Sequence, residues 1–411
     1  MKNILVFLML MHCYFLAHAQ NHENLDSILN VQQNEIKSIK KVKISGYFQP
    51  EFQWAQSKGI KYPGGDFASN VDNRFSVRRA RVKIAYHADP FELVLVTENT
   101  EKGISLHDVY GSYTMEKVGL KYIAGIFPRP FGFEQSYSTL VHEGPERARF
   151  STIMLPAEAD LGFKVNYFKL KPFNFEFGVY NGNATVADFD SYKDLVARIS
   201  IDKKIKATKL SGGVSFYHGK VIQGTPYQYK TVRFQNNLVG YVLQDTLENK
   251  KGDGALRQYV GADIQYAINS NLGTTTLRAE WINGTQPASS STSDSPRSGT
   301  LANYDTYSRK FNSLSTYFLQ NIGKTNLQLV VKYDWFDPNT DAEADDIGNL
   351  NKLNATDIKY NTLGLGFNYY LSNMRIMLYY EFIQNEKATH LNGYAEDIKD
   401  NVLTIRTQFK F

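Results

Sequence analysis

The last eleven residues of the chain alternate strictly between apolar and polar positions and end on an aromatic side chain. One face carries Leu403, Ile405, Thr407, Phe409 and Phe411, and the other carries Val402, Thr404, Arg406, Gln408 and Lys410. At the edge of a soluble sheet, such a strand would be an aggregation hazard. It suits the closing strand of an outer-membrane β-barrel, which has one face in lipid and one in water.

The same period of two recurs along the chain in segments about as long as a tilted strand needs to cross a membrane. The sixteen segments cover residues 43–55, 74–87, 91–99, 106–116, 118–127, 160–169, 173–182, 194–202, 208–218, 256–268, 273–283, 311–322, 325–336, 358–371, 374–385 and 401–411. In the segment 325–336, Leu329, Val331 and Tyr333 would face lipid, while Lys332 and Asp334 would face the lumen. The segment 74–87 changes parity near Arg78 and Arg79, which predicts a β-bulge there.

The links between these segments alternate between short and long. The short links are 88–90, 116–117, 170–172, 203–207, 269–272, 323–324 and 372–373, and the long links are 56–73, 100–105, 128–159, 183–193, 219–255, 284–310, 337–357 and 386–400. This rhythm predicts an all-β fold, a transmembrane antiparallel β-barrel of 16 strands with short periplasmic turns and long extracellular loops. A soluble β-sandwich or propeller is the alternative, but it explains neither the closing strand nor the export signal that the first nineteen residues resemble.

The first residues have the features of an export signal. Lys2 precedes an apolar run over residues 4–16, and Ala17-His18-Ala19 offers a small-x-small cleavage site. We therefore expect residues 1–19 to be a signal peptide, residues 20–42 a periplasmic extension and residues 43–411 the barrel. In the extension, a heptad-like stripe predicts a short coiled coil; its members are Leu25, Leu29, Gln32, Ile36 and Ile39.

Composition agrees with a barrel and excludes several other classes. Aromatic residues make up 14% of the chain although the mean hydropathy is only -0.38, as expected when hydrophobic positions alternate and aromatic girdles flank them. The net charge of +5 is too small to indicate nucleic-acid binding. The single cysteine, Cys13, lies in the signal, so we expect no disulfide and no thiolate metal site. Metalloprotease, Walker and dinucleotide motifs are absent from the sequence, so we expect neither an enzyme nor a cofactor.

Several motifs follow one another between residues 73 and 182. They are the arginine pair before Ala-Arg in 73–82, Asp-Val-Tyr-Gly-Ser-Tyr at 108–113, Gly-Ile-Phe-Pro-Arg-Pro-Phe-Gly-Phe-Glu at 125–134, Glu-Arg at 146–147, Asp-Leu-Gly at 160–162 and Val-Tyr-Asn-Gly at 179–182. In this order they resemble the phosphate-selective porin O and P family of bacterial outer membranes. Pro128 and Ala159 depart from that family, where a lysine and an arginine are common.

The resemblance implies a homotrimer whose third long loop, residues 128–159, folds into each lumen as a constriction. That loop contains Arg129, Arg147 and Arg149, and guanidinium groups bind oxyanions with paired donors. These three are the predicted constriction residues. Four further bases are predicted to line the pore wall: Arg79, Arg81, Lys83 and Lys121.

Inward carboxylates could neutralise these bases by pairing with them. They are Glu51, Glu92, Glu98, Asp108, Glu176, Asp263, Glu280, Asp334 and Glu381. The predicted function is passive diffusion of small hydrophilic solutes, with a preference for anions such as phosphate. The alternative is a non-conducting barrel for adhesion or structural assembly. Outer-membrane lipid and lipopolysaccharide are the expected surroundings.

The long link after residue 336 contains an acidic stretch, residues 337–346, with five carboxylates. Such a cluster either holds a divalent cation, or bridges to lipopolysaccharide, or is a solvated loop. The glycine and closing glutamate of a calcium loop are missing, which favours the solvated loop.

Overall fold

The structure, a computed structural model, describes residues 31–33, 41–155, 157–235, 237–246, 248–297, 303–349 and 351–411. The predicted signal peptide and, apart from Gln32, the predicted coiled-coil stripe lie outside these residues. Within them, no helix is both long and apolar enough to cross a membrane.

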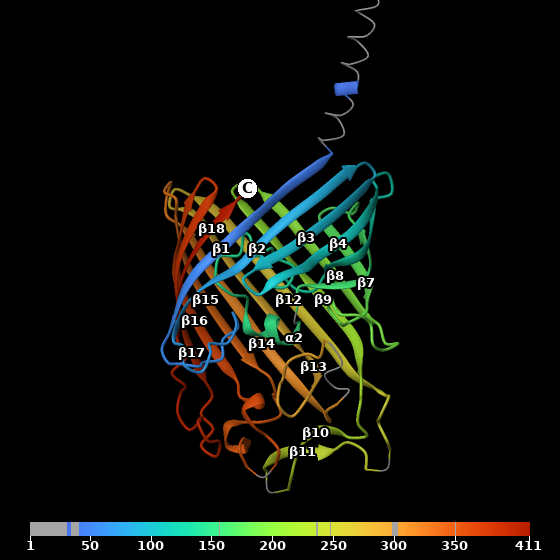
Figure 1. The fold of residues 1–411 in the computed structure, drawn as a ribbon, viewed down its shortest axis with the longest axis vertical. Helices are drawn as coiled ribbons and strands as arrows, with labels where there is room; N and C mark the ends of the chain where they lie inside the picture. Colours follow the sequence, from blue (N-terminus) through green and yellow to red (C-terminus); the bar gives the residue numbers. More distant parts are fainter. Residues whose placement is uncertain are drawn as a thin grey trace, which may run out of the picture.

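Sixteen antiparallel strands form a closed barrel, as predicted. They are β1 (Val42–Ala55), β2 (Asn73–Ala88), β3 (Phe91–Thr100), β4 (Gly103–Met115), β5 (Leu120–Pro128), β6 (Ala159–Tyr167), β7 (Phe173–Tyr180), β8 (Asp194–Ile205), β9 (Thr208–Ile222), β12 (Gly254–Ser270), β13 (Gly273–Ala288), β14 (Thr306–Asn321), β15 (Leu327–Asp337), β16 (Tyr360–Leu371), β17 (Met374–Asn385) and β18 (Val402–Lys410). Pairing of β1 with β18 closes the ring. The start of β1 and the C-terminus lie at the same, periplasmic, end (Figure 1).

One predicted link is wrong. Residues 100–105 were expected to form a long loop, but β3 ends at Thr100 and β4 begins at Gly103. Gly103 has a φ of +118°, which a glycine adopts without steric cost, so the chain reverses within two residues. Ile104 then continues the outward apolar row of Leu106, and both side chains are exposed.

The inward and outward rows follow the predicted alternation. On β18, Ile405 and Phe409 are about half exposed, whereas Arg406 is 2% exposed and faces the lumen. On β15, Lys332 is likewise buried in the lumen while Tyr333 points outward. The outward rows together form an apolar belt around the barrel, which fits a surface solvated by lipid.

Two β-bulges interrupt this alternation. The ladder between β1 and β2 skips Arg78, which confirms the bulge predicted near Arg78 and Arg79. A second bulge, which the sequence did not predict, leaves His107 as the extra residue of β4 opposite β3. Each bulge places an additional polar side chain on the lumen side.

The extracellular loops pack against one another beyond one end of the barrel. The predicted long link 219–255 contains a hairpin of β10 (Gln228–Arg233) and β11 (Val239–Leu243), which the sequence analysis missed. β10 joins β14 in parallel, and the hairpin lies at the end of the barrel opposite the C-terminus (Figure 1). Val239 and Tyr241 form a buried cluster with residues of the loops 338–359 and 386–401.

The acidic stretch is more ordered than the solvated loop favoured by the sequence. Asp346 is 5% exposed and accepts a hydrogen bond from the Val239 amide at 2.8 Å. Asp341 accepts one from the Thr231 hydroxyl at 3.0 Å. Glu343 and Asp345 are exposed. Among the described residues, no group of three or more metal-ligating side chains could hold a metal ion.

Deleting Arg78 should leave a folded barrel, because the deletion removes the extra residue and makes the β1–β2 ladder regular. Deleting Val82 from the regular part of β2 should abolish folding, since it moves one half of the strand's apolar row into the lumen. The measurement is the shift between heated and unheated bands in SDS gels after refolding. Equal behaviour of the two deletions would contradict the prediction.

Candidate functional site

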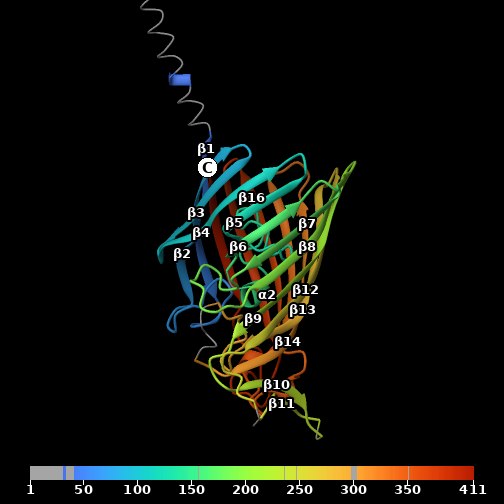
Figure 2. The same cartoon turned by 90° about the vertical axis from the view of Figure 1, so that its right-hand side faces the viewer.

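The third loop, residues 129–158, lies inside the barrel. Its short helix α2 (Arg149–Met154) lies within the ring of strands in both cartoon views (Figure 2). The loop is held by strands far away in the sequence: Arg375 of β17 donates to the His142 carbonyl at 2.7 Å, and Asn368 of β16 donates to the Glu143 carbonyl at 2.9 Å. This position confirms the loop path expected from the family resemblance.

An aromatic core fills the lumen between the third loop and one half of the barrel wall. The loop contributes Phe131, Ala148, Phe150, Met154 and Leu155, and the wall contributes Phe127, Tyr180, Val196, Tyr217, Tyr259, Ile282, Phe311 and Phe336. All of these side chains are at most 2% exposed. The half of the lumen along β5, β7–β9 and β12–β15 is therefore packed like a protein interior.

One wall carboxylate holds the start of the loop. Glu280 of β13 accepts hydrogen bonds from the backbone amides of Phe133 at 2.9 Å and Glu134 at 2.8 Å. Gly132, immediately before them, has a φ of +64°, and a Cβ there would lie 1.9 Å from Glu280 Oε1. A side chain at this position would have to push the Glu280 carboxylate aside and would hold a positive φ, which glycine adopts without steric cost.

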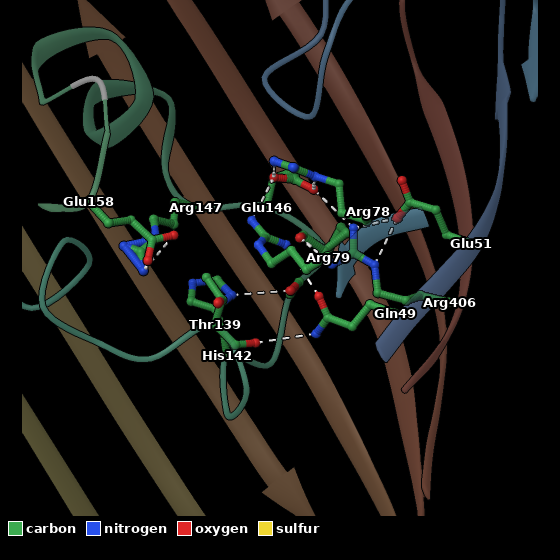
Figure 3. A network of polar contacts seen from close by, with 12 residues as sticks. Gln49, Glu51, Arg78, Arg79, Thr139, His142, Glu146, Arg147, Glu158 and Arg406 are labelled. Atoms are coloured by element: carbon green, nitrogen blue, oxygen red, sulfur yellow. Dashed lines mark hydrogen bonds and ion pairs between the residues drawn. The ribbon is translucent and has the colours of Figure 1, made fainter. Parts of the chain in front are cut away.

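A row of arginines on β2 faces the other side of the loop. Arg78 forms a bidentate pair with Glu146 of the loop, with both N–O distances at 2.7 Å, and Arg79 lies 3.4 Å from the same carboxylate. Arg406 of β18 also binds Glu146, at 2.9 Å (Figure 3). Further along β2, Arg81 bridges Glu98 of β3 and Glu158 of the loop.

Two cavities lie along the arginine row. The cavity nearer the extracellular side, which we call the upper cavity, has a volume of about 350 Å³ and extends from Arg78 and Arg79 to Asp294 and Arg297 of an extracellular loop. The lower cavity, about 510 Å³, reaches the periplasmic end at Asn373, Lys410 and Phe411. Both are lined by Arg81 and His107. They lie one after the other along β2, between an extracellular loop and the periplasmic end, and we call the lining of these two cavities the polar route.

The upper cavity carries an excess of positive charge. Its lining includes five arginines, Arg78, Arg79, Arg81, Arg147 and Arg297, and three carboxylates, Glu146, Glu158 and Asp294. Burial alone would raise the pKa of Glu146, but the charges of Arg78 and Arg79 lower it well below its usual value. Burial would likewise raise the pKa of Glu158, but the charges of Arg147 and Arg81 lower it well below its usual value. Both carboxylates are thus charged at neutral pH.

Comparison with known proteins identifies the fold. No family model matches the chain, and a search of curated proteins finds no match. Solved structures do resemble it. OprB of Pseudomonas putida has a TM-score of 0.59 at 10% identity over 92% of this chain and 96% of that one. The anion-selective porin from Comamonas acidovorans has a TM-score of 0.55 at 11% identity, over 90% and 99%. A trimer form of OmpT from Vibrio cholerae has a TM-score of 0.50 at 12% identity, over 90% and 99%.

The chain has the fold of a bacterial outer-membrane porin. The apolar belt and this fold together place it in the bacterial outer membrane. In the porin fold, the polar route along β2 occupies the position of the lumen that the aromatic core leaves unfilled.

The predicted constriction arginines have three different surroundings. Arg129 is 2% exposed, lines neither cavity and donates to the Ala157 carbonyl at 2.6 Å. Arg147 lines the upper cavity but uses its guanidinium to bind three loop carbonyls. Arg149 stacks over the Tyr360 ring at 4.0 Å, away from both cavities.

The predicted wall residues also differ in whether they line a cavity. Arg79 and Arg81 line the upper cavity, and Lys83 lines the lower one. Lys121 lines neither and pairs with Glu92 at 3.0 Å. Inward acids do pair with inward bases elsewhere in the lumen, as the sequence analysis allowed; the pairs are Arg198–Asp263, Arg257–Asp194, Arg278–Glu143, Lys164–Glu176 and Arg406–Glu51.

Sequence reasoning missed four residues of this site. Arg78 and His107 reach the lumen through bulges, and Glu146 and Glu158 reach β2 through the path of the loop. The bulge predicted near Arg78 was the one signal that could have added Arg78 to the inward row.

Replacing Gly132 with alanine should undock the loop from the wall. The new Cβ would displace Glu280 from two amides, and each lost hydrogen bond costs about 0.5–1.5 kcal/mol. We expect a lower thermal unfolding midpoint in detergent and faster protease cleavage within residues 129–158. Gly393→Ala is the control, because Gly393 has a φ of +84° but no atom within 4 Å of a Cβ, so only backbone strain of about 1 kcal/mol applies. Equal effects of the two variants would contradict the docking role.

Proposed function

We propose that this protein is a passive outer-membrane diffusion channel for small hydrophilic solutes, with a preference for anions. The observation that carries the proposal is the polar route along β2, where five arginines face three carboxylates. Rings of charged side chains set the selectivity of pores. The excess positive charge favours anions, and no covalent step or cofactor is needed for their passage.

Two arginines of the route keep donors free for a passing oxyanion such as phosphate. Arg79 makes only long contacts, 3.4 Å to Glu146 and 3.5 Å to Gln49. Arg297 makes no hydrogen bond or ion pair with another described residue. Guanidinium groups bind phosphate and carboxylate through paired donors.

The second candidate is a non-conducting barrel that serves adhesion or assembly. The aromatic core favours it, because side chains fill half of the lumen. The two candidates differ in conductance. Single-channel recording of the purified protein in a planar bilayer, under a potassium chloride gradient and with phosphate added stepwise, separates them. Chloride preference with block by phosphate supports the proposal, and absence of conductance refutes it.

Arg79→Gln should lower the ratio of chloride to potassium permeability about sevenfold, because one unit charge ~7 Å away in water changes the permeability of each ion about threefold and in opposite directions. Lys310→Gln is the matched control, because Lys310 is exposed on the outside of β14 and pairs with Asp341. The reversal potential gives the ratio for each protein. An unchanged permeability ratio in Arg79→Gln would show that the arginine row does not set the ion selectivity.

We also propose a homotrimer, because one part of the barrel wall lacks a neighbour. β2 pairs with β3 only from Arg81 onward, so residues 73–80 have a strand partner on the β1 side alone. Exposed strand edges do not occur in the hydrocarbon region of a membrane. Phe75 and Ile104, beside this gap, are 85% and 78% exposed. A second copy of the chain would cover the edge, and a trimer form is on record for the similarly folded OmpT.

Replacing Phe75 and Ile104 together with serine should convert the trimer to folded monomers. The apolar contact between copies would be lost while the barrel's own hydrogen bonds remain. Native mass in detergent measures the change, and Leu277→Ser on β13, across the barrel, should leave the trimer intact. A monomeric native protein would refute the homotrimer.

A further inference from the structure

Among the described residues, His107 is the one histidine that lines the polar route. It is the extra residue of the β4 bulge, and it lines both the upper and the lower cavity. The third loop has a histidine of its own, His142, which is 4% exposed, contacts Glu134 and lines neither cavity. The side chain of His107 is 14% exposed. A solute on the route therefore passes His107.

Both ring nitrogens of His107 face carboxylates. Nδ1 lies 2.9 Å from Asp108 Oδ1, and Nε2 lies 3.0 Å from Glu158 Oε2. Glu158 is ionised, since it also accepts two hydrogen bonds from the Arg81 guanidinium at 3.0 and 3.1 Å. Ionised carboxylates only accept hydrogen bonds, and the imidazolium cation is the form of the ring that can donate to a carboxylate on each side.

The groups around the ring define the charge of the junction. The carboxylates are Asp108 on β4, Glu158 on the third loop and Glu98 on β3, and the bases are Arg81 and Lys83 on β2 and Arg147 on the third loop. Three negative charges thus face three positive ones. A protonated His107 gives the junction one excess positive charge, and a neutral His107 removes that excess.

We propose that His107 is a proton-controlled selectivity residue of the pore. With its ring protonated, the junction carries one excess positive charge, which adds to that of the upper cavity and favours small inorganic anions. When the ring loses its proton, this excess charge is lost and the preference for anions falls. This inference rests on the proposed channel function and adds its dependence on pH.

The test compares reversal potentials of the wild type, His107→Gln and His107→Lys in a tenfold potassium chloride gradient between about pH 5.5 and 9. In the wild type, the ratio of chloride to potassium permeability should fall about sevenfold as pH rises, because one unit charge ~7 Å away in water changes the permeability of each ion about threefold and in opposite directions. His107→Gln should show the low ratio at every pH. His107→Lys, which keeps a positive charge, should show the high ratio throughout.

His87→Gln is the matched control. His87 is also on the barrel wall, but its side chain is 49% exposed, its Nδ1 lies 3.7 Å from Glu92, and it lines neither cavity. This variant should keep the wild-type pH dependence. The heat-induced band shift in SDS gels checks that every variant is folded.

The possible failures can be told apart. A pH dependence that survives in His107→Gln would overturn the role of His107 while leaving the channel function intact. A conductance that rises in His107→Gln with the pH dependence unchanged would show a purely structural link between β4 and the loop. Absence of conductance in the wild type would overturn both this inference and the proposed function.

Discussion

The period of two along a barrel strand limits which residues can reach the pore. Successive side chains point alternately to lipid and to lumen, so an unbroken strand offers only every second residue to the solute. The two bulges relax this limit, at Arg78 and His107. Both bulges lie on strands facing the same side of the third loop, and both added side chains bind a loop carboxylate. The polar route is therefore richer in charge than strict alternation would permit.

The third loop brings its own backbone groups into the lumen, and wall side chains satisfy many of them. Glu280 accepts from two loop amides, while Arg375, Arg406 and Asn368 donate to loop carbonyls. Unsatisfied groups in this space would cost about 1–3 kcal/mol each. The wall's polar residues thus hold the loop in place, and the aromatic core on the opposite face of the loop fixes which half of the lumen stays open.

The strands could be predicted from the sequence because their signal is local. Alternation, strand length and the rhythm of links depend only on neighbouring residues, and the parity change at Arg78 even located a bulge. The link 100–105 was wrongly predicted to be a long loop. β4 already begins at Gly103, whose positive φ allows a tight reversal, and Ile104 continues the outward row of the strand. The spacing of apolar residues does not reveal that backbone conformation. The β10–β11 hairpin was missed since its strands are short and pack against other loops rather than lipid.

The site itself could be predicted only in part, for a different reason. Arg79, Arg81 and Lys83 follow from strand parity, so the alternation places them correctly on the lumen side. The destinations of Arg129, Arg147 and Arg149 depend on the path of the loop across the lumen, and that path is set by contacts with strands more than a hundred residues away. No local pattern encodes those contacts.

In the proposed channel, loop position and selectivity would be coupled because the same ion pairs would serve both. Glu146 and Glu158 bind arginines of the wall, which holds the loop, and they also cancel part of the positive charge that would attract anions. Breaking a buried pair leaves an uncompensated charge, which is costly. A change at either carboxylate would therefore alter pore width and charge together. Arg297 and Lys83 make no hydrogen bond or ion pair with another residue that the structure describes, so each would contribute charge alone, and substitutions there would separate the electrostatic part of the proposed selectivity from the steric part.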